Sequence, residues 1–213
     1  MLQKIIDDKL LADYNKPRER SGKFSPSQFG RCYRYQFWHR KNEPVTNPPE
    51  VRIIRKFKSG VLFHNFIQGL FEGQTEVKCE EDDVLGFADL VTEDSVIDIK
   101  TVHSGMYHYM TKSDYNIRER EFNRWLQVAY YAKILKKPKI SLFFVSKDDL
   151  CVREYFDTYS KWEGKLELEL SLLRGFWKED DLPEAKPRAY KDSKGVPKEC
   201  AFCSYKNKCM EMF

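Results

Sequence analysis

Two aspartates and a lysine near the middle of the chain have the types and spacing that can hold a divalent cation against a phosphodiester. They occur in the stretch 86–100, whose sequence is GFADLVTEDSVIDIK. Side chains alternate along a strand, so Asp98 and Lys100 point to the same face. A two-residue turn at 93–94 would place Asp89 directly opposite Asp98. Like charges facing each other destabilise a sheet unless a cation lies between them, so this register predicts a metal site.

The same stretch also fits a simpler interpretation as a solvated strand edge. An Asp-x-Lys sequence is common on exposed strands, and two neighbouring acids are weak support for catalysis. A three-residue turn would place Asp89 opposite Ile99 and separate the two carboxylates. Other residues of the chain must therefore distinguish the two interpretations.

A second group of residues suited to metal binding lies near the end of the chain. Three thiols there are separated by two and then five residues: Cys200, Cys203 and Cys209. Cys32, far upstream, is the candidate for a fourth ligand. Iron–sulfur clusters are held by four thiolates, whereas zinc ribbons usually use two local pairs. We therefore expect an iron–sulfur cluster, with zinc as the alternative, and we expect Cys79 and Cys151 to be buried apolar residues in strands.

Two histidines are further candidates. His64 occurs in the apolar run 61–67, where a lone histidine is usually a core residue. The helix that contains it leads into the strands of Asp89 and Asp98, so His64 could add a nitrogen ligand to an oxygen-rich site. His103, which follows the second of these strands, is the other histidine expected to touch a substrate.

A polar stripe marks the helix predicted over 116–136. At about 100° per residue, four side chains share this stripe: Arg120, Arg124, Gln127 and Tyr131. Arginine can grip phosphate, and glutamine and tyrosine can hydrogen-bond or stack on a nucleotide. The alternative is an ordinary amphipathic helix with a polar exposed face.

The elements that must position these residues predict an α/β fold, with a mixed sheet flanked by helices. Helices are expected over five ranges: 2–14, 25–40, 52–71, 116–136 and 159–176. Strands are expected over five more: 75–81, 84–92, 95–101, 139–145 and 151–155. The second helix should begin with Ser25 as its cap and Pro26 in its first turn.

Composition indicates a folded chain with a well-solvated surface. Of 213 residues, 41% are hydrophobic, 15% aromatic and 33% charged, which excludes a disordered chain. The net charge of +4 is modest, so affinity for nucleic acid would have to come from local patches. No apolar run is long enough to span a bilayer and no signal-peptide core is present, so we expect a cytoplasmic protein with no membrane partner and reduced thiols.

Taken together and in order, these residues resemble a known family. His64, the Gly86–Asp89 element, Asp98–Lys100 and Gln127–Tyr131 look like the motifs of RecB-like nucleases of the PD-(D/E)XK superfamily. With one upstream cysteine and the closing Cys-x2-Cys-x5-Cys, the chain looks most like the CRISPR-associated Cas-four exonucleases and the related iron–sulfur nuclease domain of AddB. The resemblance spans roughly 25–209. Two departures are an aspartate before Ile99, where glutamate is frequent, and the lack of a proline before Asp89.

The resemblance implies a restriction-endonuclease-like fold in a single nuclease domain over 1–213. Its nuclease core would be 52–176, and 25–40 and 198–213 would together form an iron–sulfur clasp. The implied activity is that of a metal-dependent DNA exonuclease, with or without endonuclease activity, acting on single-stranded DNA or DNA ends. Such an enzyme would serve recombination, repair, phage DNA processing or CRISPR spacer processing, with Mg²⁺ or Mn²⁺ and a structural 4Fe-4S cluster. Expected partners are DNA and a CRISPR integrase or a recombination protein.

The resemblance also implies a role for each candidate. The implied metal ligands are His64, Asp89, Asp98 and the backbone carbonyl of Ile99. Lys100 would position the attacking water and stabilise charge on the phosphoryl group. Gln127 and Tyr131 would hold the strand or the water, and Arg120, Arg124 and His103 would contact DNA. Two alternatives stay open: a catalytically silent nuclease fold that binds DNA ends in a larger complex, and a zinc-binding regulatory module.

Overall fold

The computed structural model describes residues 1–17, 20–192, 194 and 196–212. At its centre is a five-stranded sheet in the order β1-β2-β3-β4-β5. The strands are β1 (Gln74–Glu80), β2 (Leu85–Val91), β3 (Ser95–Val102), β4 (Lys139–Ser146) and β5 (Val152–Thr158). β3 and β4 run parallel, whereas the other neighbouring strands pair antiparallel. The sheet is therefore mixed, and the predicted α/β class is confirmed.

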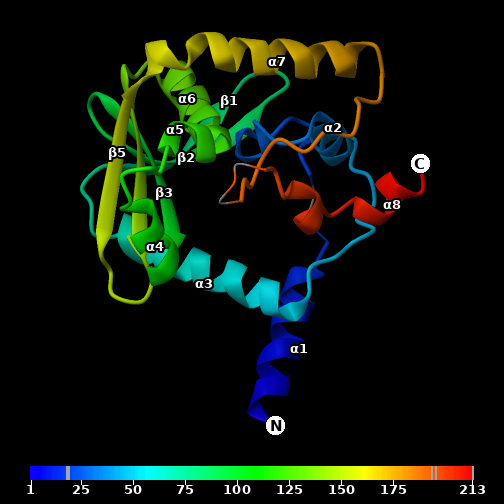
Figure 1. Ribbon diagram of the computed structural model, residues 1–213, viewed down its shortest axis with the longest axis horizontal. Coiled ribbons are helices and arrows are strands. Elements are labelled where there is room, and N and C mark those ends of the chain that lie inside the picture. Colours follow the sequence, from blue (N-terminus) through cyan, green and yellow to red (C-terminus); the bar gives the residue numbers. More distant parts are fainter. Residues whose placement is uncertain (18–19, 193, 195, 213) are drawn as a thin grey trace.

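Helices flank this sheet (Figure 1). The α-helices are α1 (Leu2–Tyr14), α2 (Tyr33–Arg40), α3 (Val51–Gln68), α4 (Ser104–Met110), α5 (Ile117–Arg120), α6 (Phe122–Leu135), α7 (Glu163–Lys178) and α8 (Lys206–Met210). Short 3₁₀ turns are η1 (Pro26–Gln28), η2 (Tyr159–Lys161) and η3 (Glu199–Phe202). Helices α4, α5 and α6 lie between β3 and β4 in the chain, and they form the crossover that a parallel strand pair requires.

Two apolar cores lie on the two faces of the sheet. On one face α6 packs on the strands and α7 packs on α6, and Trp125 and Trp162 are among the buried residues there. On the other face Ile67 of α3 packs with Ile99 of β3. The alternation of β3 explains this division, because Val96 belongs to the first core and Ile99 to the second. The helix α3 thus approaches the site strands from the face opposite to α6.

The segment 25–40 is not one helix, so that prediction is wrong. η1 covers only a first turn, Ser25 makes no side-chain capping bond, and α2 begins after Cys32, its N-cap. Gly30 lies between them with a φ of +74°, a left-handed conformation that an α-helix cannot contain. A Cβ at Gly30 would lie 2.8 Å from the Cα of Asn123, so α6 passes too close for a side chain. Tertiary packing therefore breaks the helix and places Cys32 at the start of α2.

The helix predicted over 116–136 is also divided. α5 and α6 are separated at Glu121, whose φ of −107° and ψ of 27° are not helical. Its carboxylate accepts a hydrogen bond of 2.7 Å from the hydroxyl of Tyr115. Helix α4 was not predicted at all, and the helix expected over 159–176 begins as the separate turn η2. The other expected elements are present with boundaries shifted by a few residues.

The two cysteines outside the clasp differ in environment. Cys79 is buried in β1, as expected. Cys151 is exposed and lies just before β5, so its predicted burial is wrong. Within the described part of the chain, no helix combines the length and the apolar character that crossing a bilayer would require.

Candidate metal centre and thiol clasp

The register of β2 and β3 brings the two aspartates to the same level of the sheet. The ladder pairs Leu90 with Ile97, and its continuation sets Asp89 opposite Asp98. The turn at 92–95 closes with a backbone hydrogen bond of 3.0 Å, which is the two-residue loop assumed from the sequence. The predicted turn and the pairing next to it are therefore confirmed, whereas the ladder ends before it reaches Asp89 and Asp98.

Regular pairing between the strands ends next to Asp89. The last ladder pair is Leu90 with Ile97, and beyond it Asp89 Oδ2 accepts a hydrogen bond of 2.7 Å from the backbone N–H of Ile99. The alternation of β2 changes here as well. Ala88 packs in the core under α6, whereas Leu90, two residues later, packs in the core under α3. The Asp89 carboxylate thus lies between the two strands, where a ladder bond would otherwise form.

Lys100 links the two aspartates. Its Nζ lies 2.7 Å from Asp98 Oδ1 and 3.8 Å from Asp89 Oδ2. Asp98 is 0% exposed, and its Oδ2 has no hydrogen-bond partner among the described residues. A buried carboxylate oxygen without a partner is costly unless a donor or a cation compensates it. This oxygen is therefore a buried hydrogen-bond acceptor whose capacity the described residues leave unused.

Helix α3 brings His64 to the same place, together with an acid that sequence reasoning missed. His64 Nε2 lies 3.4 Å from Glu76 Oε1 and 3.8 Å from Asp89 Oδ1. One ligand atom from each of these three residues lies within 4.8 Å of the others. Gln68, one turn after His64, donates its Nε2 to Glu76 Oε1 and to the Asp89 carbonyl, at 2.8 Å each. These bonds tie α3 to β1 and β2.

Glu76 occupies a position that the sheet register could have revealed. The β1–β2 ladder pairs Thr75 with Leu90 and Val77 with Ala88, so Glu76 faces Asp89 between them. The residue has a φ of +51°, a rare conformation for a residue with a side chain. Such strain is characteristic of functional positions. The signal was missed because the β1–β2 turn has no Asn-Gly or Gly-x pair that specifies a register.

Burial and neighbouring charges shift the pKa of Asp89 strongly. Burial raises the pKa of Asp89 to about 7, and the charges of Asp98 and Glu76 act in the same direction. Lys100 and the N–H of Ile99 oppose this rise. A cation bound between the carboxylates would favour their ionised forms. Perturbed groups of this kind cluster at functional sites.

Gln127 and Tyr131 lie together on α6, although not on an exposed stripe. Gln127 Nε2 donates to the Tyr131 hydroxyl at 3.3 Å, and both residues are buried. Burial raises the pKa of Tyr131 well above its ordinary value, and the charge of Asp98 adds to the rise. The phenol is therefore protonated at neutral pH.

The three residues expected to contact DNA make contacts within the protein. Arg120 Nη1 donates to the Asp192 carbonyl at 2.8 Å, and Arg124 Nε lies 3.1 Å from Glu121 Oε2. His103 caps α4, where its Nδ1 accepts from the N–H of Met106 at 3.2 Å. None of these three contacts is to Asp89 or Asp98.

The four clasp cysteines come together although they lie far apart in the sequence. One small cavity of about 110 Å³ has the following thiols in its lining: Cys32, Cys200, Cys203 and Cys209. Next to the thiols, Tyr35 and Trp38 of α2 form an apolar cluster with Tyr205. Burial raises the pKa of the Cys200 and Cys203 thiols, and the charge of Cys32 adds to both shifts. The predicted grouping of these thiols is therefore present.

Comparison with known proteins gives the fold. No protein-family model matches the chain, and no curated protein matches it. The crystal structure of SSO0001 is similar, with a TM-score of 0.56 and 16% identity, over 98% of this chain and 96% of that one. An alkaline exonuclease, LHK-Exo from Laribacter hongkongensis, gives a TM-score of 0.48 at 10% identity, over 82% of this chain and 94% of that one. LHK-Exo in complex with dAMP gives 0.46 at 13% identity, over 75% and 90%. The first likeness shows a shared fold, and none of them defines a shared activity.

Proposed function

We propose that the chain is a divalent-cation-dependent DNA nuclease with a restriction-endonuclease-like fold. The observation that carries the proposal is the unpartnered, buried Asp98 Oδ2 beside Asp89 and Lys100. A buried acid of this kind is destabilising in the free protein, and a cation that binds both carboxylates would remove the cost. A fold that needed the position only for packing would have an apolar residue there.

The donor set fits a hard cation. The candidate ligands are carboxylate oxygens and one imidazole: His64, Glu76, Asp89 and Asp98, with the Ile99 carbonyl as a further prediction. Oxygen-rich sites of this composition suit Mg²⁺ or Mn²⁺. When bound, the cation would polarise the scissile phosphate and lower the pKa of water.

The side chains around the carboxylates would act on the phosphodiester directly. Lys100, held by two carboxylates, is an ammonium group that can donate to a phosphate oxygen as negative charge develops. The protonated Tyr131 hydroxyl and the Gln127 amide can hold the attacking water or the strand. The strand backbone would be guided by Arg120, Arg124 and His103, which would have to exchange protein contacts for phosphate.

A groove beside α3 offers a path for a single strand. Its volume is about 860 Å³, and its lining includes five aromatic side chains: Tyr14, Tyr35, Phe57, Tyr190 and Phe202. Phe57 and His64 are two turns apart on one face of α3, about 10 Å along the axis. Phe57 and Val61 on this face are each about half exposed, at 54% and 52%. Aromatic faces stack on bases without regard to sequence, so we propose that bases of the bound single strand stack here.

The composition of the clasp favours an iron–sulfur cluster over zinc. Zinc ribbons usually take their ligands from two local pairs of residues, whereas three of these thiols are local and Cys32 is far from them in the sequence. Iron–sulfur clusters are held by four thiolates, and four thiols line this cavity. A 4Fe-4S cluster here would join the N-terminal third of the chain to its end.

The test is cleavage of end-labelled single-stranded DNA with Mn²⁺ or Mg²⁺. We expect Asp98→Ala and Lys100→Ala each to lose at least a hundredfold in rate. Asp94→Ala and Lys78→Ala are matched controls, because both side chains are about half exposed and outside the site. Cleavage that survives both site substitutions would overturn the assignment. Binding of DNA ends by a wild-type protein that never cleaves would instead favour a non-catalytic subunit.

A further inference from the structure

A buried carboxylate next to the clasp has no part in the proposed cleavage. Glu199 is 1% exposed and directly precedes Cys200. Its Oε1 accepts from Arg31 Nε at 3.0 Å and from the N–H of Cys32 at 3.1 Å. Its Oε2 accepts from the N–H groups of Cys32 and Arg188, at 3.0 Å and 3.1 Å. The many donors explain how an acid can be buried here without a large penalty.

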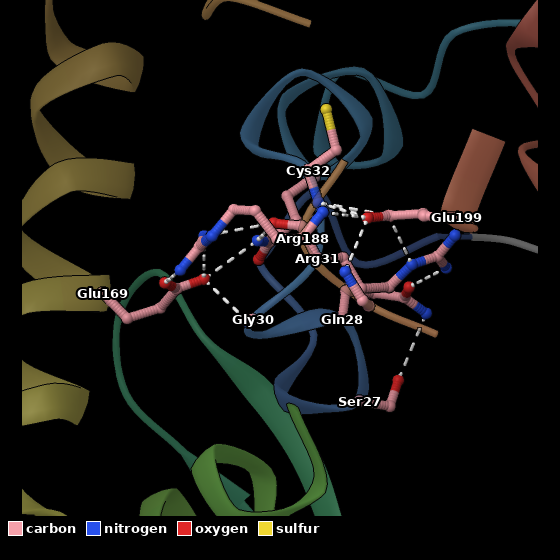
Figure 2. A network of polar contacts seen from close by, with 10 residues as sticks. Ser27, Gln28, Gly30, Arg31, Cys32, Glu169, Arg188 and Glu199 are labelled. Atoms are coloured by element: carbon pink, nitrogen blue, oxygen red, sulfur yellow. Dashed lines mark hydrogen bonds and ion pairs between the residues drawn. The ribbon is translucent and has the colours of Figure 1, made fainter. Parts of the chain in front are cut away.

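The contact with Cys32 solves a problem of the local backbone. Cys32 is the N-cap of α2, and its side chain makes no capping bond. The first N–H groups of a helix have no partner within the helix and need one from elsewhere. Glu199 supplies it from 167 residues away in the sequence. Figure 2 shows the result: the backbone nitrogen of Cys32 faces Glu199, and its sulfur points away from the network.

A second buried acid anchors the same loop without touching a cysteine. Glu169 of α7 is 2% exposed, and it accepts from the N–H of Gly30 at 2.8 Å. Arg188 joins the two acids, because its Nη2 lies 2.7 Å from Glu169 Oε2 while its backbone N–H binds Glu199 (Figure 2). The two acids therefore differ in one respect that an experiment can use. Glu199 accepts a hydrogen bond from the N–H of Cys32 itself, whereas Glu169 accepts from residues on either side of it: Gly30, Tyr33 and Gln36.

We infer that Glu199 is a positioning residue of the thiol clasp, whose carboxylate orients Cys32 toward the three C-terminal thiols and so holds the bound cluster in place. The inference rests on the proposed cluster. Groups that orient metal ligands change metal affinity by about 10- to 100-fold when they are replaced. Since Glu199 also precedes Cys200, one side chain couples the distant ligand to the local three.

The test compares Glu199→Gln with Glu169→Gln in anaerobically purified protein. Iron and acid-labile sulfide per chain, absorbance near 400 nm and the rate of iron release to a chelator are measured. Glutamine keeps the shape but turns one oxygen into a donor that faces backbone N–H groups. We expect Glu199→Gln to lose most of its iron, or to release it about tenfold faster. Glu169→Gln should lower the melting temperature while the folded protein keeps wild-type iron content and release rate.

Two further measurements keep the outcome decisive. If Glu199→Gln does not fold, Glu199→Asp, which keeps the charge but shortens its reach, should still release iron faster than wild type. Equal iron content and release rates in wild type and the Glu199 variants would overturn the inference alone. Wild-type protein without iron and sulfide would overturn the proposed cluster and the inference with it.

Discussion

The Asp89 carboxylate occupies the place of a sheet hydrogen bond, since its Oδ2 accepts the backbone N–H of Ile99 at 2.7 Å. One side chain thus does two things at the same position. It satisfies a buried donor of β3, and it presents its other oxygen 3.8 Å from His64 Nε2. These two roles can be separated by substitution.

We expect Asp89→Asn to lose cleavage activity and to keep most of its stability. The amide oxygen can still accept from Ile99, but it cannot supply the negative charge that a cation requires. Asp89→Ala should lose both, because it leaves the Ile99 N–H unpaired, at about 1–3 kcal/mol. Nuclease assays and denaturant unfolding of both variants check this. Equal stability of the two variants would contradict the structural role of Asp89.

Phe57→Ala should weaken substrate binding and leave the fold intact. Loss of a stacking platform costs about 1–3 kcal/mol per base, so KM for single-stranded DNA should rise about 5- to 100-fold with kcat unchanged. Phe57 is 54% exposed, so the melting temperature should change little. Phe156→Ala is the matched control, because Phe156 is 68% exposed on β5, outside the groove. A Phe57→Ala variant with the KM of wild type would contradict the proposal that the DNA strand binds in this groove.

Cys203→Ser should lose the cluster and the thermal stability of the clasp together. Without the Cys203 thiolate only three of the four proposed ligands are left, and the link between α2 and the C-terminal segment weakens. Iron content and melting temperature are the measurements. Cys151→Ser is the control, since Cys151 is exposed and lies outside the cavity. A soluble Cys203→Ser protein with full iron would contradict the ligand assignment.

Asp157→Asn should destabilise the protein in a pH-dependent way. Burial alone would raise the pKa of Asp157. Hydrogen bonds from four residues instead lower this pKa to about 2, and the donors are Arg118, Thr158, Trp162 and Lys161. A lowered pKa stabilises the folded state above about pH 4, and this contribution is lost as the pH falls through about 2. At pH 7 the variant should lose on the order of 2 kcal/mol.

Denaturant unfolding of wild type and Asp157→Asn at several pH values between 7 and 2 measures this contribution. The difference between them should be constant from pH 7 to about 5 and shrink below pH 4. Asp8→Asn, at an exposed site on α1, should show no comparable change. A difference that grows as the pH falls would have the wrong sign.

Gly30→Ala should lower the free energy of unfolding by about 2 kcal/mol or more. The position has a φ of +74°, and an added Cβ would lie 2.8 Å from the Asn123 backbone. Gly175→Ala in α7 is the opposite case, because nothing lies within 4 Å of its added Cβ. That substitution should raise stability by about 0.5–1 kcal/mol. Denaturant unfolding of both variants decides whether the break before α2 is required by packing.

The sequence by itself determined the features that depend on neighbouring residues. Period-two alternation placed the three consecutive strands, and the two-residue turn at 93–94 set the register that brings Asp89 and Asp98 to the same level of the sheet. Residue type and spacing also selected the four clasp cysteines, because three of them are close together in the sequence and Cys79 and Cys151 were expected in strands.

Only the tertiary structure decided the features that depend on contacts between distant segments. The break at Gly30 follows from the approach of α6, and the partner of the Cys32 N–H is supplied by Glu199. Glu76 and Gln68 join the site through packing of α3 against β1 and β2. Local propensity contains no information on these contacts, since each is made by groups that come together only after the chain has folded.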